Sequence, residues 1–308
     1  MRAIFLGTPA FAVPILAALE AAGHDVALVV TQPDRPAGRG QRLAAPPVAD
    51  LARRDGLPLW QTAGLRGGDA EMRLRQARAD VMVLAAFAAL VPRNLFLLSP
   101  AGVLNVHPSL LPRWRGASPI QAALLAGEPE TGVSIIRLVE ALDAGPILAQ
   151  RRMAISSDDD YLSLEARLSA LGAALLLDVL ADLERGTVVV AREQNDAEAT
   201  SCRKIERDDA RIDWARRAEE IWRAVRAYRG WPQAFTGWDG RLLKVLRATP
   251  LAAHAGAAPG TVLATSDLQV ATGSGTLRLD SVVLAGGRPQ TGAALKRGHP
   301  GLVGARLS

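Results

Sequence analysis

The chain has 308 residues, of which 49% are hydrophobic, and a formal net charge of +5 at neutral pH. This length suits about two domains with a sizeable core, and because no run of about 18 apolar residues occurs we expect no membrane span. A single cysteine, Cys202, excludes an intrachain disulfide and a thiolate metal cluster. That cysteine usage fits a reducing, cytoplasmic compartment, and we expect Cys202 to be a bystander.

The first 61 residues predict the beginning of a parallel α/β sheet, because strand, helix and strand follow one another within about 30 residues. In chain order the predicted elements are strands at 2–6, 25–31 and 57–61, and helices at 10–22 and 46–56. The first turn, Gly7-Thr8-Pro9, does not match G-x-G-x-x-G. This argues against a dinucleotide site of the usual kind, although the fold can still be Rossmann-like.

The middle of the chain continues the same α/β pattern. We expect strands at 80–87, 102–107, 131–139 and 146–155, and helices at 69–78, 92–98, 117–126 and from about 160 to 185. The fully apolar strand at 80–87 is typical of a central position, and the strand at 146–155 should pair antiparallel. Residues 186–202 are polar and irregular, as in a linker.

The last third has a different composition. Residues 209–229 predict a charged helix, and the short apolar runs that follow alternate with Gly-rich turns, which indicates a small β-barrel. Residues 203–308 hold 17 Lys and Arg against 9 Asp and Glu, a net charge of +8. A basic domain of this kind suggests a polyanionic partner. An Arg-rich solvated surface would give the same charge, so charge alone does not decide between the two.

Residues 32–42 read Q-P-D-R-P-A-G-R-G-Q-R, with two prolines, two glycines and three arginines. This composition excludes a regular helix and a central strand. The segment follows the second strand at its carboxyl end, where open α/β sheets bind ligands. It is either a solvent-exposed connection or a basic loop for a phosphate-rich partner, and its length favours the second reading.

Asn105 and His107 form the centre of the candidate site. They lie two residues apart at the end of an apolar strand, so their side chains project from the same face. An asparagine amide can donate to a developing oxyanion, and a histidine can bind the same oxygen or move a proton. A Pro-bracketed loop, S-L-L-P-R-W-R-G at 109–116, follows directly.

Asp143, in the turn L-D-A-G, is a candidate carboxylate to orient the imidazole and to assist proton removal from an amine. The sequence has no G-x-S-x-G nucleophile elbow, so the residues suit direct transfer through a tetrahedral intermediate. The four histidines lie far apart without H-E-x-x-H spacing, so we expect no metal.

The chain resembles the methionyl-tRNA formyltransferases, a family that uses 10-formyltetrahydrofolate. The resemblance rests on six motifs that together cover nearly the whole chain: I-F-L-G-T-P at 4–9, T-Q-P-D-R-P-A-G-R-G at 31–40, N-V-H-P-S-L-L-P-R-W-R-G at 105–116, E-T-G-V-S-I at 130–135, L-D-A-G at 142–145 and A-R-I-D-W at 210–214. The block at 105–116 is shared with other folate-dependent formyltransferases. The motifs at 31–40 and 210–214 point to the tRNA enzymes.

This resemblance implies a Rossmann-like, mostly parallel catalytic domain at 1–188, a linker at 189–205 and an OB-like tRNA-binding β-barrel at 206–308. It implies formyl transfer from 10-formyltetrahydrofolate to methionine on initiator tRNA by a cytoplasmic enzyme, which we expect to be a monomer. The residues that the resemblance assigns are Asn105, His107 and Asp143 for catalysis, Ser109, Leu110, Leu111, Pro112 and Phe87 for the folate, and Arg35, Arg39 and Arg42 for tRNA.

One departure from the family pattern affects the predicted folate pocket. Ala86-Phe87-Ala88 stands where similar enzymes carry Tyr-Gly, so the pocket should be slightly reshaped. Two alternatives stay open. Another folate-dependent formyltransferase or a formyl-folate hydrolase would keep the same chemistry without the basic loop and barrel, and a non-catalytic RNA-binding protein would bind tRNA without depending on folate.

Overall fold

The computed structural model describes residues 1–37, 42–187, 190–252 and 256–308. The chain forms two compact units, which we call the first and the second unit. The first consists of Met1–Pro119, Glu130–Ala154 and Glu165–Cys202, and the second of Ile120–Pro129, Ile155–Leu164 and Arg203–Ser308. Each unit is described by itself, and the domain boundaries given above stay a prediction.

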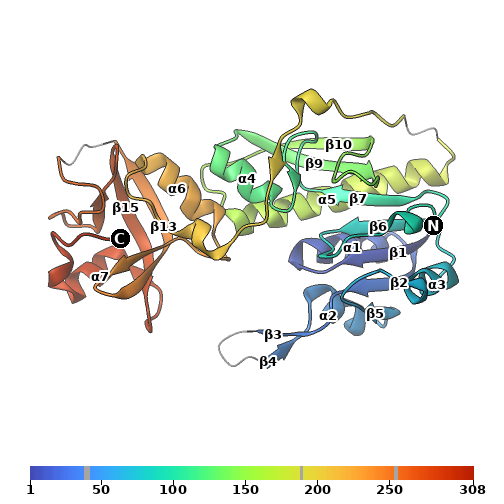
Figure 1. Ribbon diagram of the computed structural model, residues 1–308, viewed down its shortest axis with the longest axis horizontal. Helices are drawn as coiled ribbons and strands as arrows, with labels where there is room; N and C mark the ends of the chain where they lie inside the picture. The colour runs from blue at the N-terminus through green and yellow to red at the C-terminus, as the bar shows by residue number, and fades with distance from the viewer. Residues whose placement is uncertain (38–41, 188–189, 253–255) are drawn as a thin grey trace. The chain divides into compact units, whose positions relative to one another are not determined.

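A seven-stranded sheet forms the centre of the first unit, with the strand order β10-β9-β7-β6-β1-β2-β5 (Figure 1). Its strands are β1 (Arg2–Gly7), β2 (Asp25–Thr31), β5 (Leu59–Gln61), β6 (Val81–Ala85), β7 (Val103–His107), β9 (Glu130–Arg137) and β10 (Ile147–Ala154). The five neighbouring strands β5, β2, β1, β6 and β7 run parallel. β9 runs antiparallel to β7, and β10 runs antiparallel to β9. This confirms the predicted Rossmann-like, mostly parallel sheet and its antiparallel last strand.

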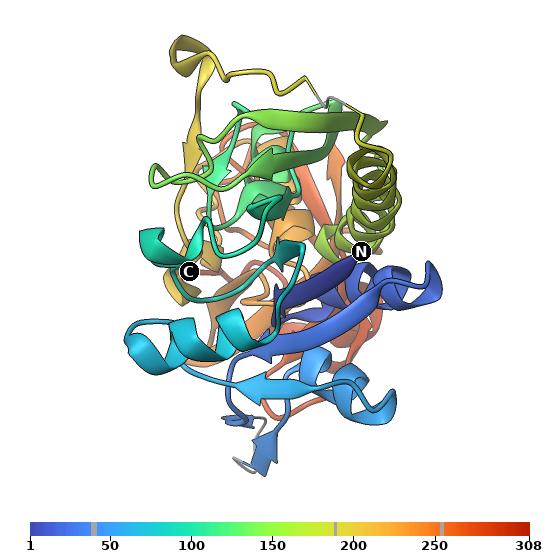
Figure 2. The same ribbon diagram turned by 90° about the vertical axis from the view of Figure 1, so that its right-hand side faces the viewer.

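Helices cover both faces of this sheet, because side chains of the buried strands alternate between the faces. On one face lie η1 (Ala10–Ala12), α1 (Val13–Ala21), α2 (Pro47–Arg54) and α5 (Tyr161–Glu184), and on the other lie α3 (Gly68–Gln76) and the single turn η2 (Arg93–Leu95) (Figure 2). Ile4 and Leu6 face α3, where they pack with Leu74. On the opposite face, Gly172 of α5 lets the helix approach Val106 of β7.

The order of the strands places the carboxyl ends of β1, β6 and β7 next to one another. The chain runs from β1 outward to β2 and β5, then returns to the other side of β1 for β6 and β7. In such sheets ligands bind outside the carboxyl ends of the strands, where the order reverses. Asn105 and His107 lie on the last three residues of β7, at this edge.

Three local predictions differ from the structure. The helix expected at 92–98 is wrong: the amides of Leu95, Phe96 and Leu98 donate to carbonyls three residues earlier, as in a 3₁₀ turn, and only η2 forms. Pro100 then disfavours helical backbone at Ser99, whose hydroxyl donates to the Gly102 carbonyl at 2.8 Å. The segment at 32–42 is more regular than predicted, since β3 (Arg35–Ala37) and β4 (Arg42–Ala44) pair antiparallel.

The helix expected at 209–229 is shorter. Its first part is a 3₁₀ turn, η4 (Arg207–Ala210), and α6 is confined to Ala218–Ala227. Between them the chain makes a turn, in which the Arg216 amide donates to the Asp213 carbonyl, and the residues on either side form isolated bridges, Arg211 with Phe235 of β12 and Arg217 with Ser274. These sheet contacts override the helical spacing of the apolar residues.

The second unit contains an antiparallel sheet with the order β12-β13-β15-β14, in which β16 also pairs with β15. Its strands are β12 (Phe235–Trp238), β13 (Arg241–Leu251), β14 (Gln269–Ala271), β15 (Thr276–Leu284) and β16 (Gln290–Thr291). The unit also contains α6, α7 (Gly292–Gly298), most of α4 (Pro119–Ala126) and the 3₁₀ turns η4 and η5 (Pro300–Leu302). β15 is the second longest strand of this sheet, after β13.

The ring of strands closes through the last residues of the chain. The Ala271 amide of β14 donates to Thr261, Val262 donates to Ala305, and Ser308 donates to Gly237 of β12. Register shifts within β13 bend the ladder, as closure requires. These contacts confirm the predicted small barrel, which encloses an apolar core that includes Trp214, Leu243 and Leu277.

Lys296 of α7 is the charged side chain buried in this barrel. It is 8% exposed, and its ammonium donates to the carbonyls of Leu263, Thr265 and Asp267 at 2.7, 2.5 and 3.0 Å. Burial lowers its pKa. Lys296 therefore binds three carbonyls of one turn with a single side chain.

No helix among the described residues is long and apolar enough to cross a bilayer.

We expect Lys296→Ala to destabilise the barrel, because it removes the charged donor that these three carbonyls share and leaves the Leu263 and Asp267 carbonyls only their bonds from Thr265. Hydrogen bonds to a charged group contribute about 1.5–3 kcal/mol, so thermal unfolding should begin several degrees lower. Arg297→Ala, at the exposed neighbouring position, is the matched control and should leave the melting temperature unchanged. Equal melting curves for the two variants would show that the buried ammonium does not stabilise the turn.

Candidate active site

Asn105, His107 and Asp143 lie together at the carboxyl end of β7, as the sequence predicted. The Asn105 amide donates to Asp143 Oδ1 at 3.1 Å, and His107 Nδ1 lies 3.7 Å from Asp143 Oδ2. All three are buried, with exposed fractions of 6%, 4% and 7%. The carboxylate thus links the two side chains that share one face of β7.

The loop after β7 encloses this group. The Gly116 amide donates to Asp143 Oδ2 at 2.9 Å, and His107 Nε2 lies 3.0 Å from the Trp114 carbonyl. Both nitrogens of the His107 ring therefore face oxygen atoms. The side chain of Asp143 is fixed by donors from two different elements, a strand and a loop.

The local backbone explains why these residue types stand here. Gly116 has φ +118°, and a Cβ at this position would lie 2.2 Å from the Cys202 carbonyl oxygen. Only glycine allows this approach, in which β8 (Arg115–Gly116) pairs with β11 (Ser201–Cys202). Asp143 itself has φ +50°, in the left-handed region that aspartate tolerates better than most residues.

The segment Ser109–Pro112, the predicted folate loop, is held by side chains of the two antiparallel strands. Ser134 of β9 accepts from the Leu111 amide at 3.1 Å and donates to the Ser109 carbonyl at 2.7 Å. Gln150 of β10 donates to the Leu111 carbonyl at 3.0 Å. Ser109 and Leu111 are buried, whereas Leu110 and Pro112 are half-buried. The loop therefore presents the side chains of Leu110 and Pro112 on a fixed backbone.

Phe87 lies apart from that loop. It is buried at 8% exposure in the apolar cluster beside Ile4 and Leu95, on the α3 face of the sheet. Its neighbours Ala86 and Ala88 are exposed, at the carboxyl end of β6. The structure does not bring the Phe87 side chain together with Ser109–Pro112, and its assignment to the folate site stays a prediction.

Two of the three predicted tRNA contacts, Arg35 and Arg42, lie on the paired strands β3 and β4 after β2. Arg35 and Arg42 are exposed on β3 and β4, and Arg35 donates to Gln32 Oε1 at 2.9 Å. Arg39 lies outside the described residues. Asp34, at the base of the hairpin, accepts from Gln61 at 2.6 Å, and this hydrogen bond lowers the pKa of its carboxyl. The base of the hairpin is thus attached to β5, and two of its arginines face solvent.

The sequence analysis missed several residues that hold the site in place: Ser134, Gln150, Gln194 and Cys202. Cys202 Sγ accepts from the Ser118 amide at 3.4 Å, and burial raises the pKa of its thiol. A neutral thiol of this kind is a poor nucleophile. Ser134 lies in the motif E-T-G-V-S-I at 130–135, which gave it no role of its own, whereas Gln150, Gln194 and Cys202 belong to none of the six motifs. Only their polarity next to buried strands could have drawn attention to these side chains.

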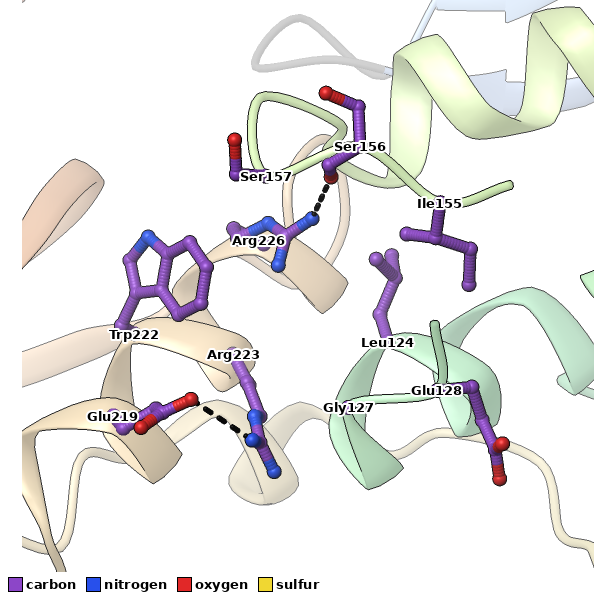
Figure 3. A pocket seen from close by; sticks show the side chains of 10 residues that line it. All are labelled: Leu124, Gly127, Glu128, Ile155, Ser156, Ser157, Glu219, Trp222, Arg223 and Arg226. Carbon is purple, nitrogen blue, oxygen red and sulfur yellow. Dashed lines mark hydrogen bonds and ion pairs between the residues drawn. The ribbon is translucent and has the colours of Figure 1, made fainter. Parts of the chain in front are cut away.

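A separate cavity of about 160 Å³ lies within the second unit (Figure 3). Arg226 lines this cavity and donates to the carbonyls of Asp159 and Ser156 at 2.5 and 2.6 Å. Its guanidinium lies 4.3 Å from the centre of the Trp222 ring. Arg223 pairs with Glu219 at 2.9 Å. The arginines are thus occupied by protein groups, and the cavity holds none of the three candidate catalytic residues.

The side chains of Asn105, His107 and Asp143 can support a limited set of reactions. An asparagine amide and an imidazole are positioned to bind an oxygen atom that gains negative charge, and the carboxylate can accept a proton. In the part of the chain that the structure describes, no group of three His, Cys, Asp or Glu side chains is placed to hold a metal ion. The site is therefore suited to acyl-type transfer through a tetrahedral intermediate.

Comparison with known proteins agrees with this chemistry. Residues 1–180 match the formyl transferase family, and residues 204–300 match the formyl transferase C-terminal domain. The chain is 43% identical over 308 residues to a methionyl-tRNA formyltransferase of Methylococcus capsulatus, covering 100% of this chain and 99% of the relative. It is 47% identical over 298 residues to one of Anaeromyxobacter dehalogenans, covering 95% of each chain.

The fold also resembles solved structures. HypX from Aquifex aeolicus, in complex with tetrahydrofolic acid, superposes with a TM-score of 0.66 at 19% identity, covering 96% of this chain and 47% of that one. At this identity the likeness shows the fold alone. The relatives of high identity and nearly full coverage, together with the two family matches, show that this chain belongs to the methionyl-tRNA formyltransferase family.

Proposed function

We propose that the protein transfers the formyl group of 10-formyltetrahydrofolate to the α-amine of methionine carried by initiator tRNA, in the cytoplasm. The observation that carries the proposal is the buried carboxylate of Asp143 between Asn105 and His107. Family membership supplies the reaction class. That the protein acts as a monomer stays a prediction.

In the proposed reaction the methionyl amine attacks the formyl carbon and forms the new carbon–nitrogen bond. The oxygen of the formyl group gains negative charge, and the Asn105 amide and His107 ring stabilise it. One hydrogen of the Asn105 amide is bound to Asp143, so the second is left for the substrate. The bond to N10 of the folate then breaks, N10 takes up a proton, and the amine loses one towards Asp143, directly or through water.

This mechanism places a requirement on His107. Nε2 faces the Trp114 carbonyl and Nδ1 faces Asp143. To reach the formyl oxygen, the ring must exchange its contact with Trp114 for one with substrate. Catalytic hydrogen bonds often form fully only when substrate is bound, and the contact with Asp143 can keep the ring aligned during the exchange.

The folate is proposed to bind along Ser109–Pro112. The backbone of this loop is fixed by Ser134 and Gln150, so its half-buried Leu110 and Pro112 offer apolar surface for a flat ring system without further ordering. We propose that the tRNA is held by the basic hairpin, through Arg35 and Arg42, and by the basic barrel. Such contacts should depend strongly on salt.

The direct test of the function is an assay with radiolabelled formyl-folate and four acceptors: methionyl initiator tRNA, methionine alone, a sugar-nucleotide amine and water. We expect label on the methionyl-tRNA and little on the others. Transfer mainly to the sugar amine would assign the chain to another formyltransferase class, and release of formate without acceptor would identify a hydrolase.

The catalytic assignment predicts a loss of rate without a loss of binding. Asn105→Ala and His107→Ala should each lower turnover by about 10²–10³-fold, as the removal of one oxyanion donor does in other enzymes. The dissociation constant for tRNA should change less than threefold, which filter binding can measure. Comparable turnover in both variants would refute the assignment of these residues.

The assignment of the β3–β4 hairpin to tRNA binding predicts weaker use of tRNA without a change in the use of formyl-folate. Arg42→Ala should raise the KM for methionyl-tRNA about tenfold and leave the KM for formyl-folate unchanged, because it removes a phosphate contact. Arg54→Ala is the matched control, since this exposed arginine pairs only with neighbouring Asp55 among the described contacts. Equal effects of Arg42→Ala on both KM values would contradict a tRNA contact.

A further inference from the structure

The segment that follows α5 in the first unit runs next to the candidate active site. Arg192 and Ile147 exchange two backbone hydrogen bonds, of 2.8 and 2.9 Å, at its beginning. At its end the Trp114 amide donates to Thr200 Oγ1 at 2.9 Å, and β11 pairs with β8. The sequence predicted a linker here, but both ends of this stretch are attached to elements that build the site.

Gln194 lies between these two attachments and is half-buried, whereas its neighbours Glu193 and Asn195 are exposed. Its Nε2 donates to the carbonyls of Asp143 and Gly145, at 2.8 and 2.7 Å. Its Oε1 accepts from Arg115 Nε at 3.0 Å. Both amide hydrogens and the amide oxygen are therefore used, and all three contacts lie in the turn of Asp143 or in β8.

The turn at Asp143 needs such an attachment. Asp143 has φ +50°, a conformation that costs free energy for a residue with a side chain. Leu142 is 65% exposed, so apolar packing does not hold this end of the turn. On the other side Gly145 lies against Arg137, where a Cβ would be 1.8 Å from the carbonyl oxygen. The turn is thus anchored to β9 behind Gly145, and Gln194 supplies the opposing polar contact.

Gln194 also fixes the second element that binds the carboxylate. Arg115 belongs to β8, and the next residue, Gly116, donates its amide to Asp143 Oδ2. One amide side chain therefore spans the backbone of Asp143 and the strand whose amide binds the Asp143 carboxylate. A shift of either would lengthen the contacts to Asn105 and His107.

We infer that Gln194 is a positioning residue for Asp143: it clamps the 143–145 turn against β8 and thereby holds the carboxylate in contact with Asn105 and His107. The expected effect of Gln194 on turnover rests on the proposed function. Its expected effect on the position of the turn does not, because that effect follows from the three hydrogen bonds of the Gln194 side chain.

The kinetic test is Gln194→Ala. We expect kcat to fall about 10–100-fold, in line with the loss caused by misplacement of a catalytic group by about 1 Å, with both KM values within threefold of wild type. Gln194→Glu should not restore the rate, because its carboxylate would face two carbonyl oxygens without a donor. Asn195→Ala is the control, since that side chain only accepts from Ala197 and donates to Glu198 within η3 (Asp196–Glu198).

A second readout does not depend on turnover. Hydrogen exchange of the Gly116 amide, followed by NMR, should become at least tenfold faster in Gln194→Ala and stay unchanged in Asn195→Ala. Unchanged exchange in Gln194→Ala, or a kcat equal to wild type, would overturn the inference. If the wild-type protein transferred no formyl group, the proposed function would fail, and the exchange rates would still decide whether Gln194 positions the turn.

Discussion

The carboxylate of Asp143 is the point on which the candidate site depends. It accepts hydrogen bonds from the side chain of Asn105 and the backbone of Gly116, and it faces the ring of His107. These partners come from the central strand β7 and from β8 in the loop that follows it, so the carboxylate joins the strand to its loop, as the contact between His107 and the Trp114 carbonyl also does. Because it is buried, its charge acts where water screens little.

The fold brings this carboxylate to the carboxyl edge of the sheet by two arrangements. The return of the chain to β6 and β7 places Asn105 and His107 at the end of β7, beside β6, and the antiparallel β9 and β10 leave the turn of Asp143 next to β7. Polar side chains of those added strands, Ser134 and Gln150, also hold the loop after His107. The antiparallel edge therefore supports the loop that we propose for the folate, and the parallel part carries Asn105 and His107.

The sequence was sufficient for the sheet, for the presence of a small barrel and for the grouping of Asn105, His107 and Asp143. Spacing of two placed Asn105 and His107 on one face, and resemblance joined Asp143 to them. The sequence was insufficient to predict the role of Gln194, since no pattern distinguishes a glutamine that binds buried carbonyls from a solvated one in an irregular polar segment. The same limit applies to closure of the barrel, where Ser308 pairs with Gly237 across 71 positions of the sequence. Propensity failed at 92–98, where hydrogen bonds between residues three apart replace an α-helix, and at 209–217, where a turn and two bridges to distant residues determine the backbone.

The measurement that tests the account most directly is a double-mutant cycle of single-turnover formyl transfer with Gln194→Ala and Asp143→Asn. If Gln194 acts by holding the carboxylate, the two losses must be strongly non-additive, because removal of the charge leaves nothing for Gln194 to position. We expect the double variant to transfer the formyl group no more than about threefold slower than Asp143→Asn alone. Fully multiplicative losses would contradict the central role of the Asp143 carboxylate and its support by Gln194.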